Sequence, residues 1–188
     1  METAQIITAI ISSSVLSAAL TSAFNMRIQN LNYKRDYYKM IIERRVEAQE
    51  QIIKLSNEMK IMVHLNNGTL CNRICATGEK YFSNFVILVA ASVNQSFWLS
   101  EELGDILISL NIFLLQEIDY KMANSSESEK NKLLESLGVK NHEKIRELRK
   151  QIDKQLLYDF SKMDKVRCFI KSRRKPNDKR YELRKEVN

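Results

Sequence analysis

Residues that build tight turns are scarce in this sequence. Its 188 residues include four glycines and one proline, too few for an all-β protein with many turns. Glu, Lys, Leu, Ile and Ser are abundant instead, and this composition favours an all-α fold. Four scattered glycines also exclude a glycine-rich phosphate loop of the Walker or Rossmann type.

Cysteine and histidine are rare as well. Cys71, Cys75 and Cys168 form no Cys-x-x-Cys pair, and the first two give only a weak zinc pattern without histidine partners. We expect buried, reduced thiols, which fit the cytosolic side of a membrane. His64 and His142 are 78 residues apart and belong to no recognised catalytic motif. We therefore predict no catalytic residue, no cofactor and no metal site, with a histidine general base as the alternative.

Positive charge is concentrated at the C-terminus. The chain carries a formal net charge of +7, and residues 165–188 hold ten Lys or Arg against three acids, so the remainder is balanced. We predict that residues 171–188 form a basic tail that contacts anionic lipid headgroups, at about 1 kcal/mol per residue, or RNA phosphates. Lipid is favoured because Tyr181 is the tail's one aromatic residue for base stacking. The candidate contacts are Lys171, Arg173, Arg174, Lys175, Lys179 and Arg180.

Uncharged residues run without a break from Thr3 to Met26. As a helix these 24 residues would reach about 36 Å, enough to cross a hydrocarbon core of roughly 30 Å. Large apolar residues point in all directions around this helix, which favours a span over a helix lying on the bilayer surface. Arg27 and Lys34 follow the segment, so the positive-inside rule places the N-terminus outside and the remainder in the bacterial cytoplasm. A cleavable signal peptide is the competing interpretation, although Glu2 stands where a base is expected.

Small polar residues form one face of this segment. Ten of its 24 residues are Ser, Thr, Asn or Gln, and lone polar side chains that face lipid are costly. This face should therefore meet another helix, in a dimer or bundle, or line a water-filled pore that Ile7 and Ile10 narrow at its outer end. We name this face the polar stripe; it consists of Ser14, Ser17, Thr21 and Asn25, and Asn32 continues it beyond the segment.

The predicted architecture is a membrane anchor that continues into a helical bundle, with self-association of the anchor. The anchor covers residues 1–26, a long juxtamembrane helix covers 27–66, a bundle covers 67–170 and the basic tail covers 171–188. The long helix has an apolar stripe that includes Ile42, Val46 and Ile53. Within the bundle we predict a loop over 69–78 and then a buried helix over 81–99, with a membrane hairpin as the alternative. The next helix runs from its Ser100 cap to about Met122. A short helix follows that Ser126 caps and Gly138 ends, and a last helix runs from Asn141 to Ile170.

Two sequence runs behind the anchor, Asn32-Tyr-Lys-Arg-Asp-Tyr-Tyr-Lys and Glu43-Arg-Arg-Val-Glu-Ala, resemble those of small membrane-anchored helical proteins of bacterial antiphage loci. The whole architecture is similar to that of the single-span accessory proteins of type VI-B CRISPR systems, whose cytosolic part resembles a divergent HEPN helical bundle. This resemblance implies a homo-oligomeric membrane pore that enhances antiviral defence beside an RNA-guided RNA nuclease. The HEPN ribonuclease motif, an Arg followed four to six residues later by His, does not occur here, so no nuclease residue is carried over.

Three functions follow from these observations. The favoured one is a self-associating effector that permeabilises the bacterial inner membrane through a pore. The second is a membrane-tethered adaptor whose bundle docks a cytosolic partner and whose anchor only dimerises. The third is a HEPN-type ribonuclease, active or degenerate.

Overall fold

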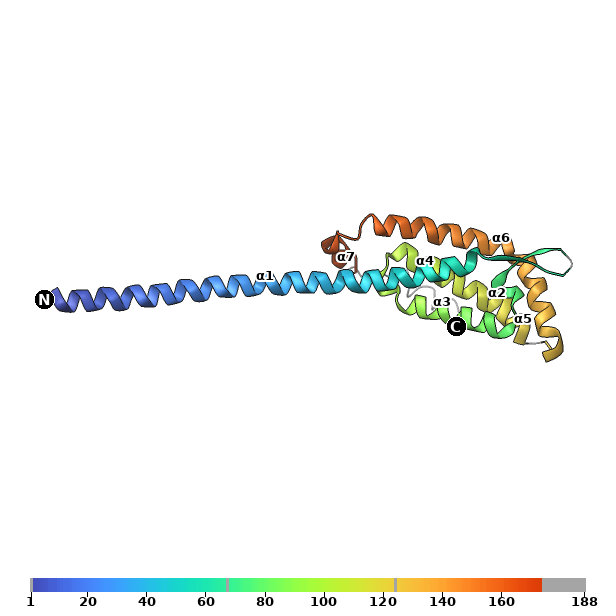
Figure 1. Cartoon of the computed structure of the whole chain (residues 1–188), viewed down its shortest axis with the longest axis horizontal. Coiled ribbons are helices and arrows are strands. Elements are labelled where there is room, and N and C mark those ends of the chain that lie inside the picture. Colours follow the sequence, from blue (N-terminus) through green and yellow to red (C-terminus); the bar gives the residue numbers. More distant parts are fainter. Residues whose placement is uncertain (1, 67, 124, 174–188) are drawn as a thin grey trace, which may run out of the picture. The chain divides into compact units, whose positions relative to one another are not determined.

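The computed structural model describes residues 2–66, 68–123 and 125–173, with side chains from Val15 onward except those of residues 127 and 128. Helices make up most of the described chain, which confirms the predicted all-α class, and a single two-stranded hairpin is added to them. Two compact units divide the chain, unit 1 (Met1–Ile41) and unit 2 (Ile42–Asn188). Figure 1 labels the α-helices along the chain.

One helix, α1 (Glu2–Lys60), supplies the described residues of unit 1 and continues into unit 2. No glycine or proline interrupts its 59 residues, and the helix is unbroken as predicted. Side chains from Val15 to Tyr37 are all exposed. Within the part of the chain that the structure describes, no helix contains a stretch long and apolar enough to cross a membrane.

The end of α1 differs from the prediction. The helix stops at Lys60 instead of continuing to Leu65, and β1 (Met62–His64) then pairs antiparallel with β2 (Leu70–Asn72). Gly68, with a φ of 78°, supplies the left-handed residue of the connecting turn. The turn residues alone do not distinguish such a hairpin from the end of a helix.

The predicted loop over 69–78 is wrong, because β2 and a short helix over 73–76 lie within it. The cap at Ser100 is confirmed, because its hydroxyl oxygen accepts a hydrogen bond from the Leu103 N–H at 3.2 Å. Ser126 is the residue before the longest helix of unit 2, and its hydroxyl donates to the Glu129 carboxylate at 2.6 Å. The elements are α2 (Arg73–Ala76), α3 (Glu79–Asn94), the 3₁₀ turn η1 (Ser96–Trp98), α4 (Glu101–Leu114), the π-helical segment η2 (Leu115–Asp119), α5 (Tyr120–Ala123), α6 (Glu127–Phe160) and α7 (Val166–Arg173).

Apolar side chains of α1, α3, α4 and α6 form the core of unit 2. Phe82 and Val89 of α3 are fully buried, so the segment over 81–99 packs into the core as predicted. The predicted inner faces of α4 and α6 are also confirmed, except that Phe160 is exposed. Their buried members are Leu107, Leu110, Leu114, Ile118, Ile145, Leu148, Ile152 and Leu156.

The predicted stripe, which also includes Tyr38, Met59 and Val63, coincides only in part with the buried face of α1, where Met59 is buried. Ile53 is exposed and Val46 only half-buried, whereas Arg45, Gln49 and Ile52 are buried. Two polar residues thus point into the interior of unit 2. The sequence pattern placed them outside because polar residues usually face water on an amphipathic helix.

A single helix, α6, replaces the two helices predicted around Gly138. Gly138 lies inside it, and the Asn141 side chain donates to the Leu137 carbonyl at 2.9 Å instead of capping a new helix. The prediction that the last helix reaches Ile170 is also wrong, because α6 ends at Phe160 and a turn separates it from α7. Glycine lowers helix propensity without preventing a helix, and here tertiary packing decides.

Candidate functional site

The polar stripe runs along α1 in unit 1. At about 100° per residue, Ser17, Thr21, Asn25 and Asn32 fall within an arc of about 80° on the helix surface. All four side chains are exposed. The predicted alignment is therefore present in the helix. Ser14, Ile7 and Ile10 belong to α1 by their backbone, and their side chains lie outside the described ones.

Small side chains leave a shallow hollow along this face. It is lined by three stripe residues together with Ala18, Ser22, Met26 and Gln29. Small residues spaced by four on a helix allow a second helix to approach closely, and their hydroxyls and amides equally offer hydrogen-bonding groups to water. The geometry of one copy fits both interpretations of the stripe.

Large apolar side chains occupy the other faces of the same helix. Val15, Leu16, Leu20 and Phe24 are each 63–65% exposed. Fully burying one such side chain is worth about 1.5–3 kcal/mol, and a soluble monomer rarely leaves a continuous apolar surface uncovered. In a single copy of the chain, this part of α1 therefore leaves its large apolar side chains uncovered.

Two of the predicted tail contacts, Lys171 and Arg173, belong to α7. Lys171 is exposed on α7. Arg173, predicted to contact headgroups or RNA, instead donates to the carbonyl oxygens of Ser96, at 3.0 Å, and of Leu99. Its guanidinium also lies over two aromatic rings, with 5.7 Å to the centroid of Phe97 and 5.6 Å to that of Phe169. Arg173 thus holds α7 against η1.

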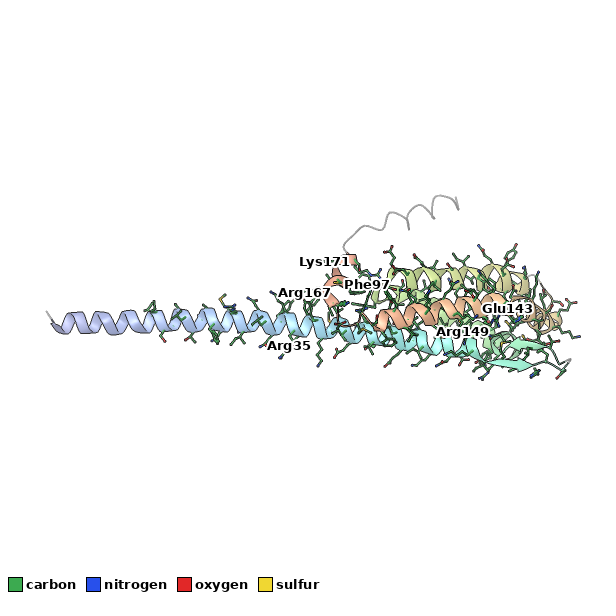
Figure 2. The ribbon with its side chains drawn as sticks, turned by 90° about the horizontal axis from the view of Figure 1, so that it is seen from above. Arg35, Phe97, Glu143, Arg149, Arg167 and Lys171 are labelled. Atoms are coloured by element: carbon green, nitrogen blue, oxygen red, sulfur yellow. The ribbon has the colours of Figure 1, made fainter. Side chains whose placement is uncertain are left out.

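Figure 2 labels Phe97, Arg167 and Lys171, which gather near α7. Arg174, Lys175, Lys179 and Arg180, the other predicted contacts, lie outside the described residues. Helix α7 therefore includes residues 171–173, the first three of the predicted tail. The sequence pattern did not predict a separate helix here because α7 is short and mostly polar.

A buried polar cluster, which the sequence did not predict, joins α1 to the end of α6. Arg45 is 4% exposed and donates to the Met163 carbonyl at 3.1 Å. Burial lowers the pKa of its guanidinium from the usual value, while the charge of Asp159 raises it. The Asp159 carboxylate in turn accepts from the Ser100 N–H at 3.0 Å and from Gln155 at 3.2 Å. The sequence contained one sign of this burial: Arg45 precedes Ile52 by two steps of three or four residues, so the two residues share one face of the helix.

The thiols and histidines show no arrangement typical of catalysis. Burial, with a contribution from the neighbouring Cys71, raises the pKa of Cys75 to about 12, so this thiol stays protonated near neutral pH. His142 contacts the Val139 carbonyl at 3.0 Å and the Glu143 carboxylate at 3.1 Å, whereas His64 lies in β1 near the Gly68 carbonyl. Among the described residues, no group of three or more potential ligands is placed to hold a metal ion.

Comparison of the chain with protein-family models, with curated proteins and with solved structures finds no match.

Proposed function

We propose that this chain is a membrane-anchored effector of bacterial antiphage defence. Copies self-associate through the first part of α1 and surround a water-filled pore whose lining is the polar stripe. The anchor crosses the inner membrane with its N-terminus outside and unit 2 in the cytoplasm. Opening of the pore permeabilises the membrane.

The observation that supports this proposal most is the complete exposure of α1 from Val15 to Tyr37 in a single copy. The uncharged run from Thr3 to Met26 is long enough for a span. Four of its isoleucines precede Val15 and are therefore outside the described side chains. A helix that exposes one face to water is also less apolar on average than a helix that faces lipid all round.

The role in defence rests on the resemblance to the type VI-B CRISPR accessory proteins. In that role an RNA-guided RNA nuclease would be the cytosolic partner, and unit 2, with its HEPN-like helices, would receive the signal. The basic residues of α7 and of the tail would contact anionic lipid, with RNA as the weaker candidate. Among the residues of unit 2 that the structure describes, no arrangement supports an RNA-cleaving role for the chain itself.

A second function is favoured by one observation, the hollow of small side chains on α1. In this alternative the stripe is a helix contact without a lumen, and the chain is a membrane-tethered adaptor that docks a cytosolic partner. Both models place the same residues at the centre of the assembly. They differ in what a larger side chain at the stripe does.

Thr21→Leu separates the two models. Leu keeps the helix insertable, because it is favourable in a span by a few tenths of a kcal/mol. It fills a lumen with apolar bulk, so the pore model predicts an intact oligomer in detergent and loss of membrane depolarisation on activation. In the adaptor model the same change prevents close approach of the helices and dissociates the oligomer.

Ala19→Leu is the matched control. Ala19 lies about 160° around the helix from the middle of the stripe and is exposed. It should leave both oligomer size and depolarisation unchanged. If Thr21→Leu also changes neither readout, the stripe has no role in assembly or conduction and both models fail.

A further inference from the structure

Basic residues continue the face of α1 that carries the polar stripe. Arg35 follows Asn32 by three residues and Lys39 follows Arg35 by four, so both fall within the same arc of about 80°. Both side chains are exposed, and Figure 2 labels Arg35 where it projects from α1. The polar stripe and these two basic residues therefore lie on the same face of the helix.

Other charges near this position lie on other faces. Arg27 and Lys34 are on the opposite side of α1, about 120° and 140° from the middle of the stripe. Asp36, the single acid between Thr3 and Lys39, lies just outside the arc. Glu43 follows Lys39 by one turn on the same face, and an i,i+4 acid partly offsets a lysine. Arg35 is therefore the dominant charge on the stripe side.

We infer that the pore selects anions, and that Arg35 is the residue that sets this selectivity. The inference rests on the proposed pore, in which every copy contributes one Arg35 to a ring at the cytoplasmic mouth. Rings of Arg or Lys are the usual device of anion pores. Arg keeps its positive charge at any physiological pH.

Electrostatic focusing gives such a ring its effect. The Debye length at physiological ionic strength is about 8 Å, comparable with the width of a narrow aqueous mouth. Several guanidinium groups around one mouth therefore raise the local anion concentration and lower that of cations. The hydroxyls and amides of Ser17, Thr21 and Asn25 carry no charge that would oppose this preference. Chloride, and small organic anions of similar size, are the permeant class.

The full chain, reconstituted in a planar bilayer under a KCl gradient, tests the inference through its reversal potential. We expect a chloride-to-potassium permeability ratio above about 3. Arg35→Glu should bring this ratio below 1, and Arg35→Gln should give a value between the two. Lys34→Glu is the matched control, because it makes the same charge change on the opposite face and should leave the ratio as it was.

The outcomes distinguish this inference from the proposed function. If the unaltered chain conducts with a chloride-to-potassium permeability ratio near or below 1, anion selection is overturned but the proposed pore is not. The same conclusion follows if Arg35→Glu and Lys34→Glu shift this ratio equally. Absence of conductance from a membrane-inserted oligomer overturns the pore and the inference together. Oligomer size in detergent, measured for every variant, shows that the assembly is preserved.

Discussion

Gly138 lies in the middle of α6, where an Ala would normally stabilise a helix by up to about 1 kcal/mol. Here the missing side chain makes room for two thiols. A Cβ at this position would lie 2.4 Å from the Cys75 Cβ and 2.7 Å from the Cys71 Sγ. Both cysteines are fully buried, so neither has space to move away. The contact joins residues more than 60 positions apart, so local sequence patterns do not reveal it.

Gly138→Ala should therefore destabilise unit 2 in spite of the better helix propensity of alanine. Overpacking of a tight core typically costs about 1–3 kcal/mol, and the expected effect is a lower midpoint of chemical unfolding at an unchanged slope. Ser136→Ala, at an exposed position of the same helix, is the control and should change the midpoint little. A stabilised Gly138→Ala variant would show that α2 and α6 are packed less closely than described.

At the scale of elements, hydropathy patterns predicted the helices whose buried face is apolar. The position of α3 and the faces of α4 and α6 were predictable because Leu and Ile recur every three or four residues, although α3 ends at Asn94 and not at Leu99. Burial of Cys71 and Cys75 was predictable from the lack of any pairing motif, whereas Cys168 is exposed. In unit 1, the alignment of Ser17, Thr21 and Asn25 also follows from spacing alone, since a helix without Gly or Pro keeps its register.

Elements whose boundaries depend on distant contacts were not predictable. The short hairpin has three residues in each strand, too few for an alternating pattern to stand out. The Asn72 side chain stabilises it by donating to the Met59 carbonyl at the end of α1, at 2.9 Å. The interior position of Arg45 likewise depends on acceptors contributed by the turn after α6. Local sequence contains neither partner.

The C-terminal helix gives a prediction at the same scale. A chain that ends at Arg173 should keep the stability of the full chain, because the deleted residues 174–188 offer little apolar surface to bury. A chain that ends at Ile170 loses Arg173 and its hydrogen bonds to the carbonyls of η1, and should be less stable by about 1–3 kcal/mol. Thermal unfolding of the two truncated chains in the same detergent measures the difference.

Arg173→Lys in the full chain is the accompanying control for this pair. Lysine keeps the charge and loses the planar guanidinium that lies over the rings of Phe97 and Phe169. This variant should show most of the loss of stability expected for the chain that ends at Ile170. Equal stability of the chains ending at Arg173 and at Ile170 would mean that α7 contributes nothing to the fold of unit 2.

For the whole molecule, the charges that flank the proposed anchor would decide which side of the membrane unit 2 occupies. Between Thr3 and Lys39, four basic residues and one acid all lie on the C-terminal side of the uncharged run. By the positive-inside rule we expect this side to stay in the cytoplasm. The buried thiols of Cys71 and Cys75 would suit the same compartment, whereas Cys168 is exposed. In this orientation Arg35 stands at the cytoplasmic mouth of the proposed pore.

Fusions after Asn188 test this topology. A green fluorescent protein fused there should fluoresce, and an alkaline phosphatase should stay inactive, because the former needs the cytoplasm and the latter an oxidising compartment. The charge bias can be removed and reversed by a variant that carries Asn in place of Arg27, Lys34, Arg35 and Lys39 together with Glu2→Lys. A fraction of these chains should then insert in the inverted orientation and gain phosphatase activity. An active phosphatase on the unaltered chain would contradict the scheme. So would a mature chain that begins near Phe24, because the uncharged run would then be a cleaved signal peptide and no anchor would remain to form a pore.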